Sequence, residues 1–140
     1  MVFKAVRKDP KDLDERGKRK KYAIKRIFPT IDAATIIIEM LTLKILNGEN
    51  NVTDLVSAHR AGTQVSLVFI YKKSKNFLSY FSTFKIDDIR KYMYAILNAV
   101  KHCTDKGVVH RDIKPNNFLY DPDTHTGLLI DFGSSDIEID

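Results

Sequence analysis

The sequence predicts an α+β fold, in which an antiparallel sheet with one helix precedes a long helix and a β-hairpin. Three observations predict it. Residues 2–6, 21–27 and 65–71 are short runs rich in β-branched and aromatic residues, which favour strands. Residues 86–103 repeat apolar side chains every three or four positions, which is typical of a helix. Residues 118–120 and 128–130 are short apolar runs separated by turn residues, which predict a hairpin.

Composition fits one domain with a core of its own, because the chain has 140 residues of which 44% are hydrophobic. The longest apolar stretches are interrupted by polar residues, so we expect no membrane association. A single cysteine, Cys103, cannot form an internal disulfide and suggests a reducing compartment. The net charge of +5 comes largely from residues 16–21. Nearby acidic residues (Asp12, Asp14, Glu15) favour a solvated loop here over a nucleic-acid site, so we expect no direct nucleic-acid contact.

The amino-terminal half places a lysine on a strand and a glutamate on the following helix. Residues 2–6 and 21–27 are predicted to be antiparallel strands, joined by a polar loop at residues 7–20. Residues 32–46 read as a helix closed by Asn47-Gly48. Lys25 is either an ordinary surface lysine or a phosphate ligand. Glu39 lies among apolar residues, so it either occupies the solvent face or needs a partner such as Lys25.

The middle of the chain predicts a central strand and the longest helix. A short strand is expected at residues 55–57 with a turn at Ala61-Gly62, and residues 65–71 are apolar enough for a central strand. Residues 77–81 suggest a short helical segment. The helix at residues 86–103 carries Lys101 and His102 in its last turn, where we expect no special role for His102, and Gly107 ends it. Its apolar stripe consists of Ile86, Ile89, Met93, Ile96, Leu97 and Val100.

The strongest chemical signal is the run H-R-D-x-K-x-x-N at residues 110–117, followed by D-F-G at residues 131–133. Asp112 can accept the proton of an attacking hydroxyl, and Lys114 can reach a transferred phosphoryl group. Asn117 and Asp131 carry the oxygen ligands that Mg²⁺ prefers, and the predicted hairpin would bring both to one end. The alternative is that Asp112 and Asn117 are turn formers. Two matching motifs at a fitting distance make that alternative weak.

These motifs resemble the eukaryotic protein kinase superfamily and, through Lys114, its serine/threonine branch. Within that branch the sequence is most similar to the cell-division-cycle-seven family of replication-initiation kinases. The features that carry this similarity are A-I-K-x-x-x-P-T at residues 23–30 and V-H-R-D-x-K-P-x-N-F-L-Y at residues 109–120. The resemblance covers nearly the whole chain.

The resemblance implies ATP and Mg²⁺ as cofactors and assigns the site residues. Lys25 would bind the ATP phosphates and pair with Glu39, Asp112 would be the catalytic base, and Lys114 would steady the γ-phosphate. Asn117 and Asp131 would hold Mg²⁺. The adenine would contact Val2, Ala23, Phe69, Ile70, Tyr71 and Leu119, and His110 and Phe132 would pack toward Leu43.

The resemblance also implies a nuclear, cell-cycle protein kinase with a protein substrate, the MCM replicative helicase, and an activating regulatory subunit. We expect residues 1–140 to be a partial kinase domain. Residues 1–71 would form an upper lobe lacking the Gly-rich loop. Residues 72–140 would comprise the hinge, long helix, catalytic loop and D-F-G, with the activation segment and remaining lower lobe absent.

Such a chain alone should be poorly soluble or dimerise through its bare apolar stripe, and have negligible activity. The alternative from a different class is a non-catalytic, truncated kinase-like binding module that engages a regulatory partner. A small-molecule phosphotransferase is a weaker third possibility.

Overall fold

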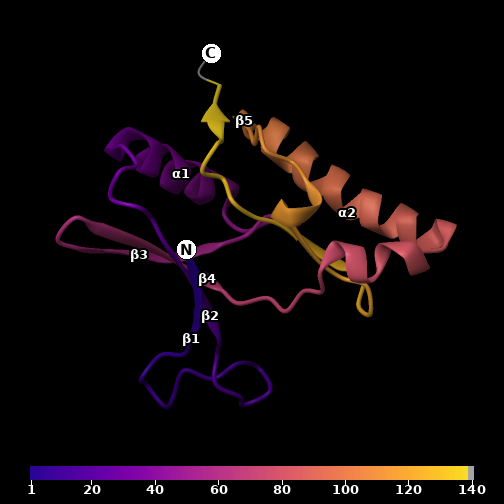
Figure 1. Cartoon of the computed structure of the whole chain (residues 1–140), viewed down its shortest axis with the longest axis horizontal. Coiled ribbons are helices and arrows are strands. Elements are labelled where there is room, and N and C mark those ends of the chain that lie inside the picture. The colour runs from indigo at the N-terminus through magenta and orange to yellow at the C-terminus, as the bar shows by residue number, and fades with distance from the viewer. Residues whose placement is uncertain (139–140) are drawn as a thin grey trace. The chain divides into compact units, whose positions relative to one another are not determined.

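The computed structural model describes residues 1–138, which form two compact units (Figure 1). The first unit consists of Met1–Asp32 and Leu55–Tyr71, and the second of Ala33–Asp54 and residues 72–138. An antiparallel sheet, a helix, a long second helix and a hairpin are all present, so the predicted α+β class is confirmed. None of the helices in residues 1–138 has the length and apolarity to cross a membrane.

The first unit is a four-stranded antiparallel sheet in the order β1-β2-β4-β3. Its strands are β1 (Val2–Ala5), β2 (Tyr22–Arg26), β3 (Leu55–Ala61) and β4 (Gln64–Ile70). The apolar strand β4 is interior, as predicted. Strand β3 runs to Ala61, further than predicted, and the turn falls on Gly62, whose positive φ of 59° suits a residue without a Cβ.

The polar loop between β1 and β2 is held by the acidic residues that dilute its charge. The Asp14 carboxylate accepts the backbone N–H groups of Arg16 and Lys18 at 3.0 and 2.9 Å. The bond from Lys18 is the main reason why the pKa of Asp14 lies below its ordinary value. The Tyr22 hydroxyl donates to Asp12 at 2.8 Å. These bonds fold the predicted loop back on itself.

The second unit contains both helices and two pairs of strands. Helix α1 spans Ala33–Leu46 and α2 spans Ile86–Asp105, with two 3₁₀ turns (Phe77–Ser79 and Phe81–Thr83) before α2. Strand β6 (Phe118–Asp121) pairs with β7 (Thr126–Leu129) in the predicted hairpin. The short strand β5 (Val108–Val109) pairs with β8 (Asp136–Ile137). Figure 1 shows the hairpin beside α2.

Helix α2 is buried through a different face from its apolar stripe. Ile86, Met93 and Leu97 of the stripe are exposed, at 68%, 43% and 59% of their surface. The buried face consists of Tyr92, Ala95, Ala99, His102 and Cys103. Small alanines allow the hairpin to approach closely, which apolar periodicity alone does not reveal.

Seven aromatic rings pack together between α2, the 3₁₀ turns and the hairpin, and four of them (Tyr80, Tyr92, Phe118 and Tyr120) are buried. Tyr92 meets Phe118 and Tyr120 edge to face, with ring centroids 5.4 and 5.0 Å apart. Burial raises the pKa of Tyr92 to about 12. A Cβ on Gly127 would lie 2.2 Å from the Phe118 ring, so only glycine fits here. The other members of the cluster are Phe77, Tyr80, Phe81 and Phe84.

The prediction that His102 has no special role is wrong. Its ring is buried, contacts the Leu46 carbonyl through Nε2 at 2.9 Å, and lies 3.0 Å from the Asn50 amide through Nδ1. Asn51 donates to the Gly127 carbonyl at 2.8 Å and accepts from Asn98. These bonds join the segment after α1 to α2 and the hairpin. They span about fifty residues or more, so no local pattern predicts them.

Candidate active site

In the first unit, strand register places several predicted site residues on one sheet face. Val2 lies opposite Lys25 on the neighbouring strand, and Ala23 lies opposite Phe69. Because directly opposed residues share a face and side chains alternate along a strand, all four project to the same side. Lys25 is half-buried there. The predicted lysine and adenine contacts are therefore neighbours within this sheet.

Two further predicted adenine contacts, Ile70 and Tyr71, lie at the end of β4 and directly after it. Ile70 follows Phe69 and so projects to the opposite face. The Tyr71 N–H donates to the Lys21 carbonyl at 2.9 Å, and the Lys4 ammonium lies 4.6 Å from the centre of the Tyr71 ring. The Tyr71 N–H is thus already used within the sheet and would not serve a bound base. The adenine roles of both residues stay predictions.

In the second unit, Glu39 lies on α1 and is buried, with 4% of its surface exposed. Thr42, Leu43 and Leu46 are the other buried residues of this helix. A carboxylate at that depth requires a partner. Lys25 belongs to the first unit, and its ion pair with Glu39 stays a prediction.

The catalytic loop joins three of the predicted residues by direct hydrogen bonds. The Lys114 ammonium donates to both oxygens of the Asp112 carboxylate, at 2.7 and 2.9 Å. The Asn117 amide nitrogen donates to Asp112 Oδ2 at 2.8 Å and to the Asp112 carbonyl at 3.0 Å. The bond from Lys114 is the largest cause that holds the pKa of Asp112 below its ordinary value, and Asn117 adds to it. Asp112 is therefore an ionised acceptor at neutral pH.

His110 ties the catalytic loop to the strand that leads to Asp131. Its Nδ1 accepts the Asp112 N–H at 3.2 Å, so Nε2 carries the proton and donates to the Ile130 carbonyl at 3.0 Å. The ring also packs edge to face on Phe132, with centroids 4.6 Å apart. Because both nitrogens contact backbone groups, His110 orders the loop.

The hairpin brings Asn117 and Asp131 to its open end. Phe118 pairs with Leu129, and the Ile130 N–H donates to the Asn117 carbonyl at 2.9 Å. Asp131 has a positive φ of 63°, a backbone conformation that non-glycine residues seldom adopt. Leu119, the predicted floor of the adenine site, lies on the same hairpin opposite Leu128.

The donor set at this end fits a magnesium ion shared with a nucleotide. The Asn117 amide nitrogen is committed to Asp112, so its oxygen is the atom that can bind a cation. Asp131 supplies a carboxylate, and it is exposed. Within residues 1–138, no three His, Cys, Asp or Glu side chains come together as a metal site. Mg²⁺ commonly binds through one or two protein ligands plus phosphates, which matches this pair.

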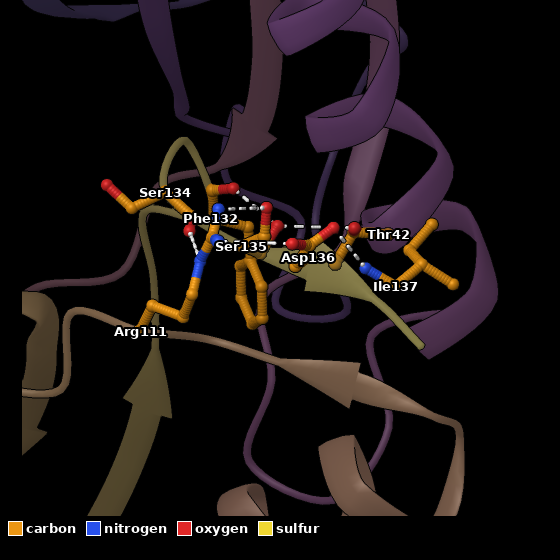
Figure 2. Close-up of polar contacts among 7 residues, drawn as sticks. All are labelled: Thr42, Arg111, Phe132, Ser134, Ser135, Asp136 and Ile137. Atoms are coloured by element: carbon orange, nitrogen blue, oxygen red, sulfur yellow. Dashed lines mark hydrogen bonds and ion pairs between the residues drawn. The ribbon is translucent and has the colours of Figure 1, made fainter. Parts of the chain in front are cut away.

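Sequence reasoning missed Arg111, which precedes Asp112 and also has a positive φ, of 64°. Its guanidinium donates to the Ser134 carbonyl at 2.6 Å and the Ser135 carbonyl at 3.3 Å, and pairs with the Asp136 carboxylate at 3.1 Å (Figure 2). The three contacts hold the segment after Gly133. The only sequence signal for them is an acidic residue shortly after D-F-G.

Comparison with known families agrees with this geometry. Residues 11–138 match the protein kinase domain model. The chain therefore belongs to the protein kinase family, which confirms the resemblance read from the motifs.

Within this family, the chain is similar to kinases of the cell division control protein 7 group. It is 38% identical to "Probable cell division control protein 7 homolog 2" of Encephalitozoon cuniculi, over 83% of this chain and 33% of that protein. It is 38% identical to "Cell cycle serine/threonine-protein kinase hsk1" of Schizosaccharomyces pombe, over 86% and 24%. The human "Cell division cycle 7-related protein kinase" is 32% identical, over 84% and 20%. The chain thus spans a third or less of the length of these relatives.

Proposed function

We propose that the candidate site residues form the part of a serine/threonine protein kinase that binds ATP and Mg²⁺. The observation that carries this proposal is the bonding of Lys114 and Asn117 to the Asp112 carboxylate. A structural ion pair explains a lysine beside an aspartate. It does not explain why the buried Asn117 also bonds to Asp112. Nor does it explain why a further carboxylate, the exposed Asp131, lies at the same end of the hairpin.

In this proposal each residue acts on a different part of the reaction. Asp112 orients a substrate serine or threonine hydroxyl and accepts its proton as the oxygen attacks the γ-phosphorus. Lys114 neutralises charge on the transferred phosphoryl oxygens, which requires it to turn from Asp112 toward the nucleotide.

Residues of each unit have a proposed role in nucleotide binding. Lys25 binds phosphate oxygens and Glu39 positions Lys25, while Val2, Ala23, Phe69 and Leu119 contact the adenine. Asn117 and Asp131 would hold Mg²⁺, which when bound neutralises phosphate charge.

We also propose, from the relatives' names, that the protein acts in the cell cycle on a protein substrate. A nuclear location, an activating regulatory subunit and the MCM helicase as substrate are finer proposals that rest on the resemblance alone.

The test measures phosphoryl transfer by the full protein that the gene encodes. The assay contains labelled ATP, Mg²⁺ and a peptide library with serine and threonine residues. We expect labelled serine or threonine, and loss of the label with Asp112→Asn. Mg²⁺-dependent ATP binding without any transfer would contradict the kinase proposal and favour the non-catalytic binding module.

A further inference from the structure

The segment after Gly133 makes a buried contact with helix α1. The Ser135 hydroxyl lies 3.2 Å from the Thr42 hydroxyl and 2.6 Å from the Phe132 carbonyl (Figure 2). Thr42 is fully buried and Ser135 is 5% exposed. Both hydroxyls are therefore removed from water and depend on each other and on Phe132 for their hydrogen bonds.

A serine hydroxyl has one proton, so it donates to only one oxygen at a time. The Ser135 hydroxyl is the donor in both contacts, so its proton alternates between the Thr42 hydroxyl and the Phe132 carbonyl. The Ser135 backbone N–H also donates to the Phe132 carbonyl, at 3.0 Å. This closes a tight turn at residues 132–135, directly after Asp131, and the Thr42 side chain of α1 contacts this turn through the Ser135 hydroxyl.

Both ends of this contact lie close to proposed site residues. Thr42 follows Glu39 by one helical turn, so the two side chains share a face of α1. Ser135 lies four residues after Asp131. The guanidinium of Arg111, the neighbour of Asp112, donates to the carbonyls of Ser134 and Ser135 in the same segment. A shift of α1 would therefore displace the turn that directly follows Asp131.

We propose that Thr42 and Ser135 are positioning residues that couple α1, and with it Glu39, to the turn at residues 132–135 that directly follows Asp131. This inference rests on the proposed function for its catalytic consequence. The coupling between α1 and the turn does not depend on the proposed function, because it can be measured without an activity assay. Neither residue would touch substrate or nucleotide.

Hydrogen exchange tests the coupling through effects on the opposite element. Thr42→Val keeps the side-chain shape and removes the hydroxyl, so it should speed exchange of the amides at residues 134–138 about fivefold, the effect of one lost hydrogen bond. Ser135→Ala should speed exchange in α1 by a similar factor.

Two further variants separate the hydroxyl from packing and from general loss of a hydroxyl. Thr42→Ser keeps the hydroxyl and loses a methyl group, so it should leave residues 134–138 closer to the parent than Thr42→Val does. Thr104→Val removes an exposed hydroxyl that donates to the Val100 carbonyl on α2, and should change neither region. Exchange effects confined to the mutated element, or a larger effect of Thr42→Ser than of Thr42→Val, would overturn the coupling.

Kinetics test whether the coupling matters for the reaction. Thr42→Val should lower kcat about fivefold and raise the Mg²⁺ concentration for half-maximal rate, with the peptide KM unchanged, and Thr42→Ser should restore both. Coupled exchange with unchanged kinetics would overturn the catalytic part of the inference. A parent protein that transfers no phosphoryl group would contradict the proposed function instead, and the exchange result would still decide the coupling.

Discussion

The two units hold their candidate site residues in different ways. In the sheet, Val2, Ala23, Lys25 and Phe69 share a face because ladder hydrogen bonds along three strands fix the register. In the second unit, Asp112 is placed by direct bonds from Lys114 and Asn117 and by the buried ring of His110.

This difference predicts how each unit responds to substitution. Register is shared among many backbone bonds, and a one-residue slip would turn every side chain to the other face, so single side-chain changes seldom move it. A loop that depends on a few side-chain bonds and on positive φ angles at Arg111 and Asp131 can be disturbed by one change.

The largest expected effect is on catalysis, from Asp131→Asn in the loop and Lys25→Met in the sheet. Each should lower kcat/KM at least about a hundredfold, because a preorganised charge is lost. Asparagine tolerates a left-handed backbone, so Asp131→Asn should keep the fold. Asp131→Asn should also raise the Mg²⁺ requirement, whereas Lys25→Met should mainly weaken ATP binding.

The matched control is Asp123→Asn, which neutralises an exposed carboxylate paired with Lys75 at 2.8 Å. We expect its turnover to equal that of the parent. Equal rates for Asp131→Asn and Asp123→Asn, measured in steady-state assays at several Mg²⁺ concentrations, would remove Asp131 from the proposed site.

The next effect, on stability, compares one glycine from each unit. Gly127→Ala forces a methyl group against the Phe118 ring and Ala95, so it should lower the free energy of unfolding by about 3 kcal/mol. Gly62→Ala, in the β3–β4 turn, meets no atom within 4 Å and bears only the strain of its positive φ, about 1 kcal/mol. Urea denaturation of both variants measures the two values. A larger loss for Gly62→Ala would contradict the packing assigned to the hairpin.

A third, smaller effect concerns the ionisation of Asp112. Lys114 is the main cause of its lowered pKa, so Lys114→Met should raise that pKa toward the ordinary value. A carboxyl with a lowered folded-state pKa stabilises the fold above its unfolded pKa, and this contribution is lost as pH falls through the folded value. The parent should therefore keep Asp112 ionised to lower pH than the variant does.

Carboxyl ¹³C chemical shifts followed from pH 6 to pH 2 would report the Asp112 midpoint directly. Lys75→Met is the control, since it removes a comparable partner from Asp123, whose pKa is also lowered chiefly by that lysine. It should move the Asp123 midpoint upward and leave Asp112 unchanged. An Asp112 midpoint that is the same with and without Lys114 would show that the loop geometry is wrong.

Much of the fold was predictable from sequence because local patterns carried it. Strand composition placed β1, β2 and β4, and two short apolar runs separated by turn residues placed the hairpin. The motifs also identified Asp112, Lys114 and Asn117 as neighbours, since positions within six residues of one loop cannot lie far apart. The family followed from the same residues.

The parts that sequence did not predict depend on long-range contacts. His102 anchors the segment after α1 through Leu46 and Asn50, and Arg111 reaches residues more than twenty positions ahead. The buried face of α2 includes the alanines Ala95 and Ala99 and none of the exposed stripe residues Ile86, Met93 and Leu97, because close approach of the hairpin requires small side chains there. Periodicity reports where apolar residues lie, and it cannot report what covers them.

The smallest expected effect tests this last point within α2. Leu97→Lys, on the exposed stripe, should change the free energy of unfolding by less than about 0.5 kcal/mol, while Ala99→Leu, on the fully buried face, should cost about 1–3 kcal/mol through overpacking. Chemical denaturation gives both values. Sedimentation should also show weaker self-association for Leu97→Lys, because a charge interrupts the exposed apolar stripe. A large loss of stability with Leu97→Lys would mean that the stripe is covered and that the helix packs through both faces.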